Sequence, residues 1–204
     1  MKEKIKVGFV GGGFVAQQCH LPTFKANQNC ELKYLAEPVA DLRSKIAKSY
    51  GFTHEVATHR ELLEIKDIDL VVVTLPRRYT INVVRDFIKT GHNVMTEKPI
   101  CLNEENGEAA INEAKESKSL VYTGYMKQHD KGVECFKNEI KDLRSEIITI
   151  KGYCHMGNSY ASPFGDIKGE DLPSGGRNIK EMFPSWLPET LEFGYEQFIN
   201  CFSH

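Results

Sequence analysis

Residues 5–18 read IKVGFVGGGFVAQQ, and this stretch decides the fold. Its opening half is a run of β-prone apolar residues that is too short for a helix and ends at glycine. A G-x-G-x-x-A pattern follows, with its small residues at Gly11, Gly13 and Ala16. A strand, a glycine turn and a helix in this order form the context in which the pattern indicates dinucleotide binding.

Each position of the pattern has its own physical role. Gly11 permits a tight turn, Gly13 lets the backbone approach a pyrophosphate, and Ala16 is small enough for the helix to pack closely on the strand. The helix that begins near Phe14 and Val15 directs N–H groups and a partial positive charge toward the phosphates. We therefore expect Gly11, Gly13, Phe14 and Val15 to bind the cofactor. The alternative is a plain glycine turn without a ligand.

Composition excludes several classes of protein. The 204 residues carry a net charge of −2, so no basic field suggests nucleic acid as a partner. No apolar run approaches the length of a membrane span, and the first residues do not read as a signal peptide. The six cysteines include no C-x-x-C pair, which favours reduced thiols over a disulfide framework or a zinc site. We expect a cytoplasmic protein without a metal.

Strands and helices alternate from residue 1 to residue 125. Pro22 is expected to interrupt the first helix near its end, and Asn103 to cap the last one. The alternation predicts a Rossmann-type α/β domain over 1–125, built on a doubly wound parallel sheet. After the first strand, the expected strands are 31–36, 55–57, 68–75, 93–96 and 120–125, and the expected helices are 14–25, 40–50, 59–65, 77–90 and 103–117.

Ligands of such a sheet bind beyond the carboxyl ends of its strands. This rule brings several loops to the same edge as the glycine turn, namely Glu37, residues 74–77, residues 97–99 and residues 125–128.

Glu37 is the expected determinant of cofactor choice. It follows the second strand, 24 residues after Gly13, near the spacing at which a Rossmann unit places an acid on the ribose 2′-OH of NAD. An acid there repels the 2′-phosphate of NADP, and Arg43 is expected to lie too far along the next helix to clamp that phosphate. The pattern therefore favours NAD over NADP. The alternative for Glu37 is a surface glutamate that closes a strand.

The pattern changes after residue 125. A helix is expected over 131–143, a strand over 146–155 and a final helix over 188–202, with a Gly-, Pro- and Ser-rich stretch over 157–183. These elements do not complete a domain. We expect residues 126–204 to be the start of an α+β substrate and dimerisation domain, incomplete in this chain.

The chain resembles the Gfo/Idh/MocA family of NAD(P)-dependent oxidoreductases over essentially its whole length. Six segments match the family in the right order. They are VGFVGGGFVAQQCHLP at 7–22, AEP at 36–38, IDLVVVTLP at 68–76, GHNVMTEKPI at 91–100, VYTGYMKQHD at 121–130 and YEQFINCFSH at 195–204.

The resemblance implies a small-molecule substrate of the sugar or cyclitol type and a hydride transfer with a nicotinamide. Lys98 matches the family lysine that lies beside the nicotinamide and helps move the hydroxyl proton; a partly desolvated lysine suits that task. Thr74, Pro76 and Glu97 match residues near the cofactor. His204 takes the place of a histidine that assists catalysis.

Two departures from the family pattern leave other functions open. Asn200 stands where the family has an aspartate, and Gln128-His129 stand where an arginine and an aromatic residue are usual. Family members are generally longer, so the chain is interpreted as the N-terminal portion of a dehydrogenase, whose homo-oligomer contact, as the resemblance implies, would lie in the part of the second domain beyond this chain. The alternatives are a non-catalytic, redox-sensing dinucleotide-binding protein and a remnant without a cofactor.

Overall fold

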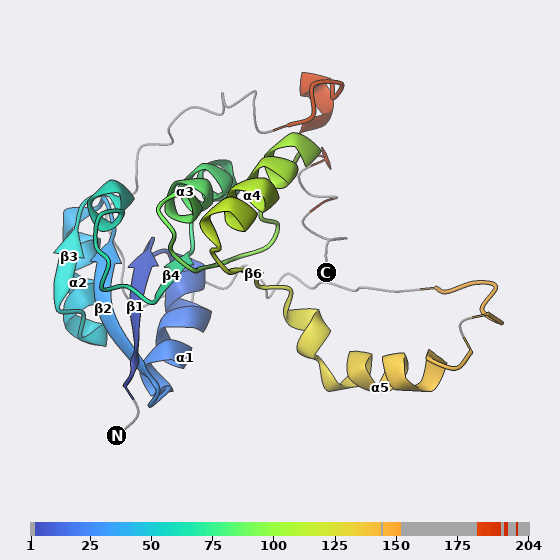
Figure 1. Ribbon diagram of the computed structural model, residues 1–204, viewed down its shortest axis with the longest axis horizontal. Coiled ribbons are helices and arrows are strands. Elements are labelled where there is room, and N and C mark those ends of the chain that lie inside the picture. Colours follow the sequence, from blue (N-terminus) through green and yellow to red (C-terminus); the bar gives the residue numbers. More distant parts are fainter. Residues whose placement is uncertain (1–2, 144, 152–182, 193, 196–198, 200–204) are drawn as a thin grey trace.

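A six-stranded parallel sheet forms the centre of the molecule (Figure 1). The computed structural model describes residues 3–143, 145–151, 183–192, 194–195 and 199. The strand order is β3-β2-β1-β4-β5-β6, which confirms the predicted Rossmann-type doubly wound sheet. The strands are β1 (Ile5–Val10), β2 (Cys30–Ala36), β3 (His54–Val56), β4 (Leu70–Val73), β5 (Val94–Thr96) and β6 (Val121–Thr123).

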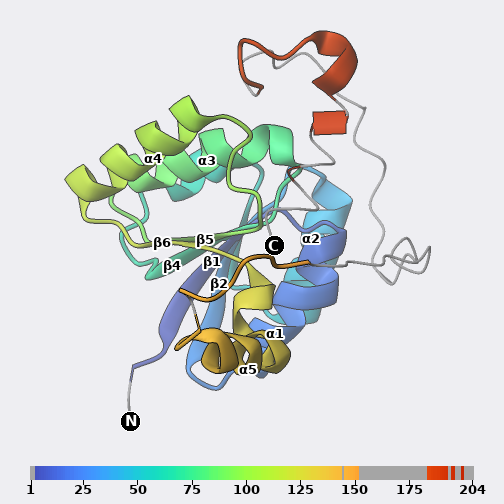
Figure 2. The ribbon, with the colours of Figure 1, turned by 90° about the vertical axis from the view of Figure 1, so that its right-hand side faces the viewer.

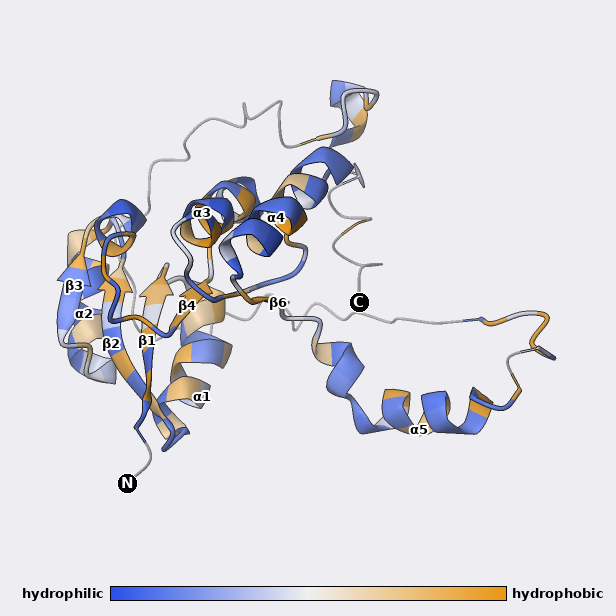
Figure 3. Ribbon diagram, in the orientation of Figure 1, coloured by the Kyte–Doolittle hydropathy of each residue, from blue (hydrophilic) through white to orange (hydrophobic). Residues whose placement is uncertain are grey.

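Helices cover both faces of this sheet (Figure 2). Helices α3 (Arg77–Lys89) and α4 (Glu104–Ser117) pack on one face, over a core that includes Phe87 and Val84. Helices α1 (Leu21–Ala26) and α2 (Ala40–Tyr50) pack on the other. The central strands are apolar on both sides, as Figure 3 shows for β1 and β4, because both of their faces are covered.

Capping residues stand at the ends of three helices, and the predicted cap at Asn103 is confirmed. The side chain of Asn103 accepts a hydrogen bond from the backbone N–H of Asn106 at 2.8 Å and so caps α4. Gly51 follows α2 with a φ of 81°, and Gly91 follows α3 with a φ of 82°. Glycine is favoured at both positions because a side chain destabilises this left-handed conformation.

The first helix differs from its prediction at Pro22. The chain is helical from residue 14 to residue 26 and is not interrupted there. A π-helical segment, η1 (Ala16–His20), comes first, and Pro22 lies in the first turn of α1. Proline is tolerated in a first turn, where its missing N–H removes little. The expected break is therefore replaced by a wider turn ahead of the proline.

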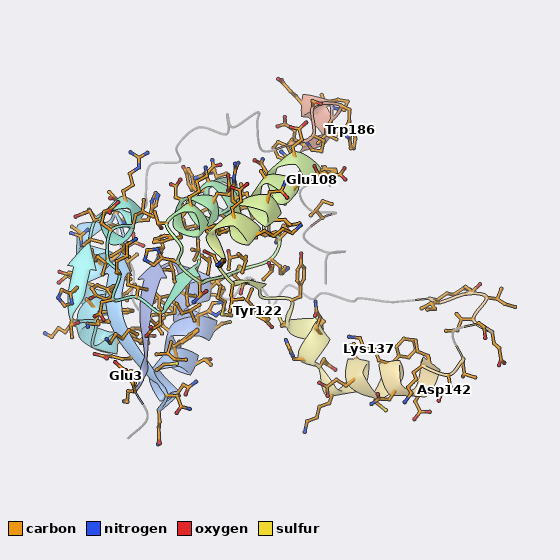
Figure 4. All side chains as sticks on the ribbon, in the orientation of Figure 1. Glu3, Glu108, Tyr122, Lys137, Asp142 and Trp186 are labelled. Atoms are coloured by element: carbon orange, nitrogen blue, oxygen red, sulfur yellow. The ribbon has the colours of Figure 1, made fainter. Side chains whose placement is uncertain are left out.

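The helix that follows β6 lies away from the sheet. A short 3₁₀ turn (Met126–His129) leads into helix α5 (Lys131–Ile140), which extends to one side in Figure 1. Figure 4 labels Tyr122 on β6, the strand from which the chain leaves the sheet. It also labels Trp186, which belongs to the described residues 183–192. A 3₁₀ turn (Glu189–Leu191) stands where the final helix was predicted to begin.

The strand predicted over 146–155 is wrong in its described part. Residues 146–151 form no strand, and the rest lies outside the described residues. Ile148 is 97% exposed, so the alternating apolar residues have no surface to pack against. A strand needs a neighbour for its backbone hydrogen bonds, and none of the described residues supplies one. In the part of the chain that the structure describes, no helix is long and apolar enough to cross a membrane.

Candidate functional site

The last residues of the six strands lie in one row. Val10 of β1 is paired with Ala36 of β2 and with Val73 of β4, and Thr96 of β5 is paired with Val73. Val56 and Thr123 continue the row at either end. Every loop that follows a strand therefore starts at the same edge, and the predicted site residues between Gly11 and Lys98 all stand there.

Gly11 makes the turn that leaves β1. Its φ is 92°, and its N–H donates to the carbonyl of Ala36 at 2.9 Å. A Cβ atom on Gly11 would lie 2.5 Å from the carbonyl oxygen of Thr74. The turn is thus packed against β4, and both the space and the backbone conformation require glycine.

Gly13 stands in the opposite environment. It is exposed, and a Cβ atom there would meet nothing within 4 Å. Phe14 and Val15, which follow it, are exposed as well. Because the fold itself does not need the space above Gly13, this open surface at the start of a helix fits the close approach of a diphosphate.

Gln17 stabilises the glycine turn from behind and was missed by the sequence reasoning. Its side-chain amide donates to the carbonyl of Gly12 at 2.7 Å, and its backbone N–H donates to the carbonyl of Gly13 at 3.1 Å. The side chain is buried. A polar residue on the inner side of a helix one turn after the glycines was the available signal.

Glu37 is buried, not a surface glutamate, and its carboxylate faces the glycine turn. One oxygen accepts from the backbone N–H of Gly12 at 2.8 Å, and the other from the N–H of Val39 at 3.0 Å. Only 5% of the residue is exposed. Each carboxylate oxygen has two lone pairs, so the group retains acceptor capacity for hydroxyl donors.

Arg43 lies closer to this corner than predicted. Its Nη1 atom donates to the backbone carbonyl of Glu37 at 2.7 Å. Arg43 therefore contacts the residue that is expected to select the cofactor. Arg43 belongs to the first turn of α2, and its long side chain reaches back toward the N-terminus of that helix.

Thr74 and Pro76 connect β4 to the glycine turn and to α3. The hydroxyl of Thr74 donates to the carbonyl of Gly11 at 2.9 Å, and this side chain is buried. Pro76 is exposed and precedes the first residue of α3. The loop after β4 is thus held against the turn after β1.

Glu97 and Lys98 follow β5. Glu97 Oε1 lies 2.7 Å from His20 Nε2, a contact that joins residues 77 positions apart. Burial alone would raise the pKa of Glu97, but the hydrogen bond to His20, its charge and the adjacent N–H and ammonium of Lys98 hold that pKa below its usual value. Lys98 is half-buried and precedes Pro99 through a cis peptide bond. Sequence reasoning missed His20.

The predicted residues from the end of the chain are only partly described. His204 and Asn200 lie outside the described residues. Tyr195, from the same matching segment, donates its hydroxyl to the carbonyl of Leu102 at 3.0 Å, just past the E-K-P turn. Gln128 and His129 are exposed, and His129 Nε2 lies 2.5 Å from the hydroxyl of Tyr122.

The described part of the chain contains no cluster of potential metal ligands. No group of three or more His, Cys, Asp or Glu side chains there could hold an ion. Four cysteines in that part have free thiols, namely Cys19, Cys30, Cys101 and Cys135.

Comparison with known proteins agrees with this geometry. A model of the Gfo/Idh/MocA oxidoreductase family, described as an NAD-binding Rossmann fold, matches residues 5–125. An inositol 2-dehydrogenase of Rhizobium meliloti (strain 1021) is 26% identical over 149 residues, which cover 72% of this chain and 44% of that protein. An α-N-acetylgalactosaminidase of Shewanella oneidensis is 28% identical over 114 residues, 50% of this chain and 24% of that protein.

One solved structure is similar to this chain over a comparable share of its length. It is that of a protein of Sinorhizobium meliloti 1021 assigned provisionally as a myo-inositol dehydrogenase, with a TM-score of 0.61 and 25% identity. The similarity covers 69% of this chain and 42% of that one, so the chain spans less than half the length of the relatives it matches. The family match includes the glycine turn, Glu37 and the E-K-P turn. The chain therefore belongs to the Gfo/Idh/MocA family of oxidoreductases, with an NAD-binding Rossmann fold.

Proposed function

We propose that this chain is the cofactor-binding portion of a dehydrogenase that transfers a hydride between a nicotinamide and the hydroxyl-bearing carbon of a sugar or cyclitol. One observation carries the proposal. The open surface at Gly13 and the half-buried Lys98 stand on the same edge of the sheet, so the diphosphate position and the proton-transfer residue can serve one dinucleotide.

The residues around the glycine turn would hold the cofactor. Gly13, Phe14 and Val15 line the approach to the start of the helix, where the helix dipole favours a diphosphate. Glu37 would accept hydrogen bonds from the adenosine ribose hydroxyls with the capacity left after its two backbone contacts. A 2′-phosphate would meet this buried carboxylate, so NAD is the proposed cofactor. Arg43 at the same corner is the residue that would favour NADP.

Proton transfer is the task of Lys98. The bound nicotinamide supplies the acceptor or donor of the hydride. A base near the carbinol oxygen must then take or return the hydroxyl proton, and Lys98, half-buried at the edge where the cofactor would bind, is proposed for this role. Thr74 and Pro76 would border the nicotinamide on the β4 side, and Glu97 would border it on the β5 side.

Residues 126–204 are proposed to begin the substrate domain. The inositol dehydrogenase relative favours a cyclitol or sugar as the substrate. His204 is proposed to assist Lys98. Tyr195, from the same matching segment, contacts the loop after the E-K-P turn. We place the protein in the cytoplasm, with a homo-oligomer as its assembly and no nucleic acid as a partner.

A second candidate function is a non-catalytic, redox-sensing dinucleotide-binding protein. Asn200 and Gln128 favour it, because neither can carry the charge of the aspartate and the arginine that the family has at these positions. In this function the protein would make the same contacts with the cofactor, and Lys98 would not act as a base.

An assay of Lys98→Met against the unchanged chain separates the two. We expect NAD⁺ reduction with a panel of inositols and aldoses to fall by about 10² to 10⁴ in the variant, while NADH affinity changes by less than about threefold. Undiminished turnover in Lys98→Met would contradict the proton-transfer role. Tight NADH binding by both proteins without turnover of any substrate in the panel would mean that this chain binds the cofactor without completing a substrate site.

A further inference from the structure

One side-chain pair joins the helix after the glycine turn to the E-K-P turn. His20 Nε2 and Glu97 Oε1 are 2.7 Å apart, and their side chains are 13% and 27% exposed. A pair shielded from water to this degree holds its geometry better than an exposed one, because solvent screens it less. The proposed site therefore contains a contact that no local spacing in the sequence indicates.

The backbone that carries His20 has an unusual form. His20 is the last residue of the π-helical segment η1, which begins with Ala16 of the glycine pattern. Such segments arise from one extra residue in a helix and are frequent at functional sites. Each residue turns a helix by about 100°, so the extra residue decides which way His20 points. Here it points to Glu97.

Glu97 connects this histidine to the proposed base. Glu97 directly precedes Lys98, and the backbone N–H and the ammonium of Lys98 both act on the Glu97 carboxylate. Gly124 lies on the other side, near enough that an added Cβ atom would be 3.6 Å from Glu97 Oε1. The carboxylate is thus held between the helix after β1, the turn after β5 and the loop after β6.

The position of Glu97 in the sheet assigns it to one half of a dinucleotide. β5 lies two strands from β1, on the side opposite to β2 and Glu37. With a diphosphate at the glycine turn and the adenosine ribose at Glu37, the nicotinamide would extend over β4 and β5. Strands are about 4.8 Å apart, so Glu97 stands about 10 Å from β1, within reach of that half.

We infer that His20 is a positioning residue for the nicotinamide half of the site: it holds Glu97, and through Glu97 the E-K-P turn, in the arrangement that receives the nicotinamide beside Lys98. This inference rests on the proposed function. It assigns a role to a residue outside the glycine pattern and the E-K-P motif, and it makes η1 a link between the diphosphate and nicotinamide halves.

Two ligands separate a positioning role from a structural one. NADH carries the nicotinamide, and ADP-ribose has the same adenosine and diphosphate without it. In His20→Ala, we expect NADH affinity measured by calorimetry to fall about tenfold and ADP-ribose affinity to stay within about twofold. Glu97→Ala, which removes the acceptor, should show the same selective loss. His20→Gln, whose amide can still donate to Glu97, should recover part of the NADH affinity.

A matched control is available elsewhere in the fold. His59 and Asp86 form a similar pair, at 3.0 Å and with side chains 21% and 41% exposed, between the η2 turn (His59–Leu62) and α3. His59→Asn should leave the ratio of NADH to ADP-ribose affinity unchanged. Urea unfolding of every variant establishes that it is folded.

Equal losses for NADH and ADP-ribose in His20→Ala and Glu97→Ala would overturn the inference, and so would unchanged NADH affinity. If the unchanged chain binds neither ligand, the proposed function fails instead, and the two failures are distinguishable.

Discussion

The edge at which the carboxyl ends of the strands lie, here called the carboxyl edge, has a glutamate on each side of β1. The two glutamates, Glu37 and Glu97, are held in different ways. On the β1–β2 side, Glu37 accepts hydrogen bonds from backbone N–H groups, those of Gly12 and Val39. On the β4–β5 side, Glu97 pairs with the side chain of His20. Backbone donors come with the fold of the turn, whereas a side-chain donor requires one residue in one helical register. The first side is therefore set by the glycine pattern, and the second depends on a contact made across the sheet.

A similar contrast separates the two glycines within the turn. Gly11 is enclosed by the carbonyl of Thr74 and has a positive φ, while Gly13 faces open space. One glycine is required by the fold, and the other is required only if a ligand approaches. Stability and cofactor affinity should therefore respond differently to the same substitution at the two positions.

Gly11→Ala is expected to have the largest effect. The left-handed φ costs a side chain about 1–2 kcal/mol. The 2.5 Å approach to a backbone oxygen adds to this cost because that atom cannot move freely. We expect the free energy of unfolding in urea to fall by about 3 kcal/mol and NADH binding to be lost with it. A variant of normal stability would mean that the turn is not packed against β4 as described.

Gly13→Ala should leave the stability of the fold unchanged and weaken the binding of the cofactor. Nothing lies within 4 Å of the added methyl group, so the free energy of unfolding should change by less than about 0.5 kcal/mol. NADH affinity should fall by about tenfold or more, since the methyl group would stand where the diphosphate approaches. Unchanged NADH affinity would show that the open surface at Gly13 is not the diphosphate position.

Glu37→Ala should have the smallest effect of the three. The loss of the acceptor for the ribose hydroxyls should lower NADH affinity a few-fold, about 1 kcal/mol. The ratio of NADH to NADPH affinity should also fall, because the carboxylate no longer repels a 2′-phosphate. Parallel fluorescence titrations of the variant and the unchanged chain measure both.

Arg43→Ala is the matched control at this corner, since Arg43 contacts the backbone of Glu37 and not its carboxylate. It should leave NADH affinity unchanged. An unaltered ratio of NADH to NADPH affinity in Glu37→Ala would remove Glu37 from cofactor selection.

Much of the arrangement at the carboxyl ends of the strands could be predicted from the sequence, because the sequence patterns that indicate it are local. The strand, turn and helix around Gly11, the alternation that follows and the rule for carboxyl ends were enough to predict the parallel sheet and the gathering of Glu37, Thr74 and Glu97. Each of these inferences needs only neighbouring residues and a topology that few alternatives match.

What the sequence did not reveal depends on side-chain reach or helical register. The extra residue in η1 and the pairing of His20 with Glu97 are decided by packing between distant elements. The reach of Arg43 to Glu37 depends on a rotamer, and periodicity carries no information about it. In its described part, residues 146–151, the predicted strand is absent because alternation describes a face and does not supply the neighbour that a strand needs.

The most direct test of the whole account is a fluorescence titration of this 204-residue chain, shown to be folded, with NADH and NADPH in parallel. We expect saturable binding of NADH, tighter than that of NADPH, because the glycine turn is open at Gly13 and Glu37 is buried beside it. A folded chain that binds neither nucleotide would contradict it, and the carboxyl edge would then be a scaffold without a cofactor.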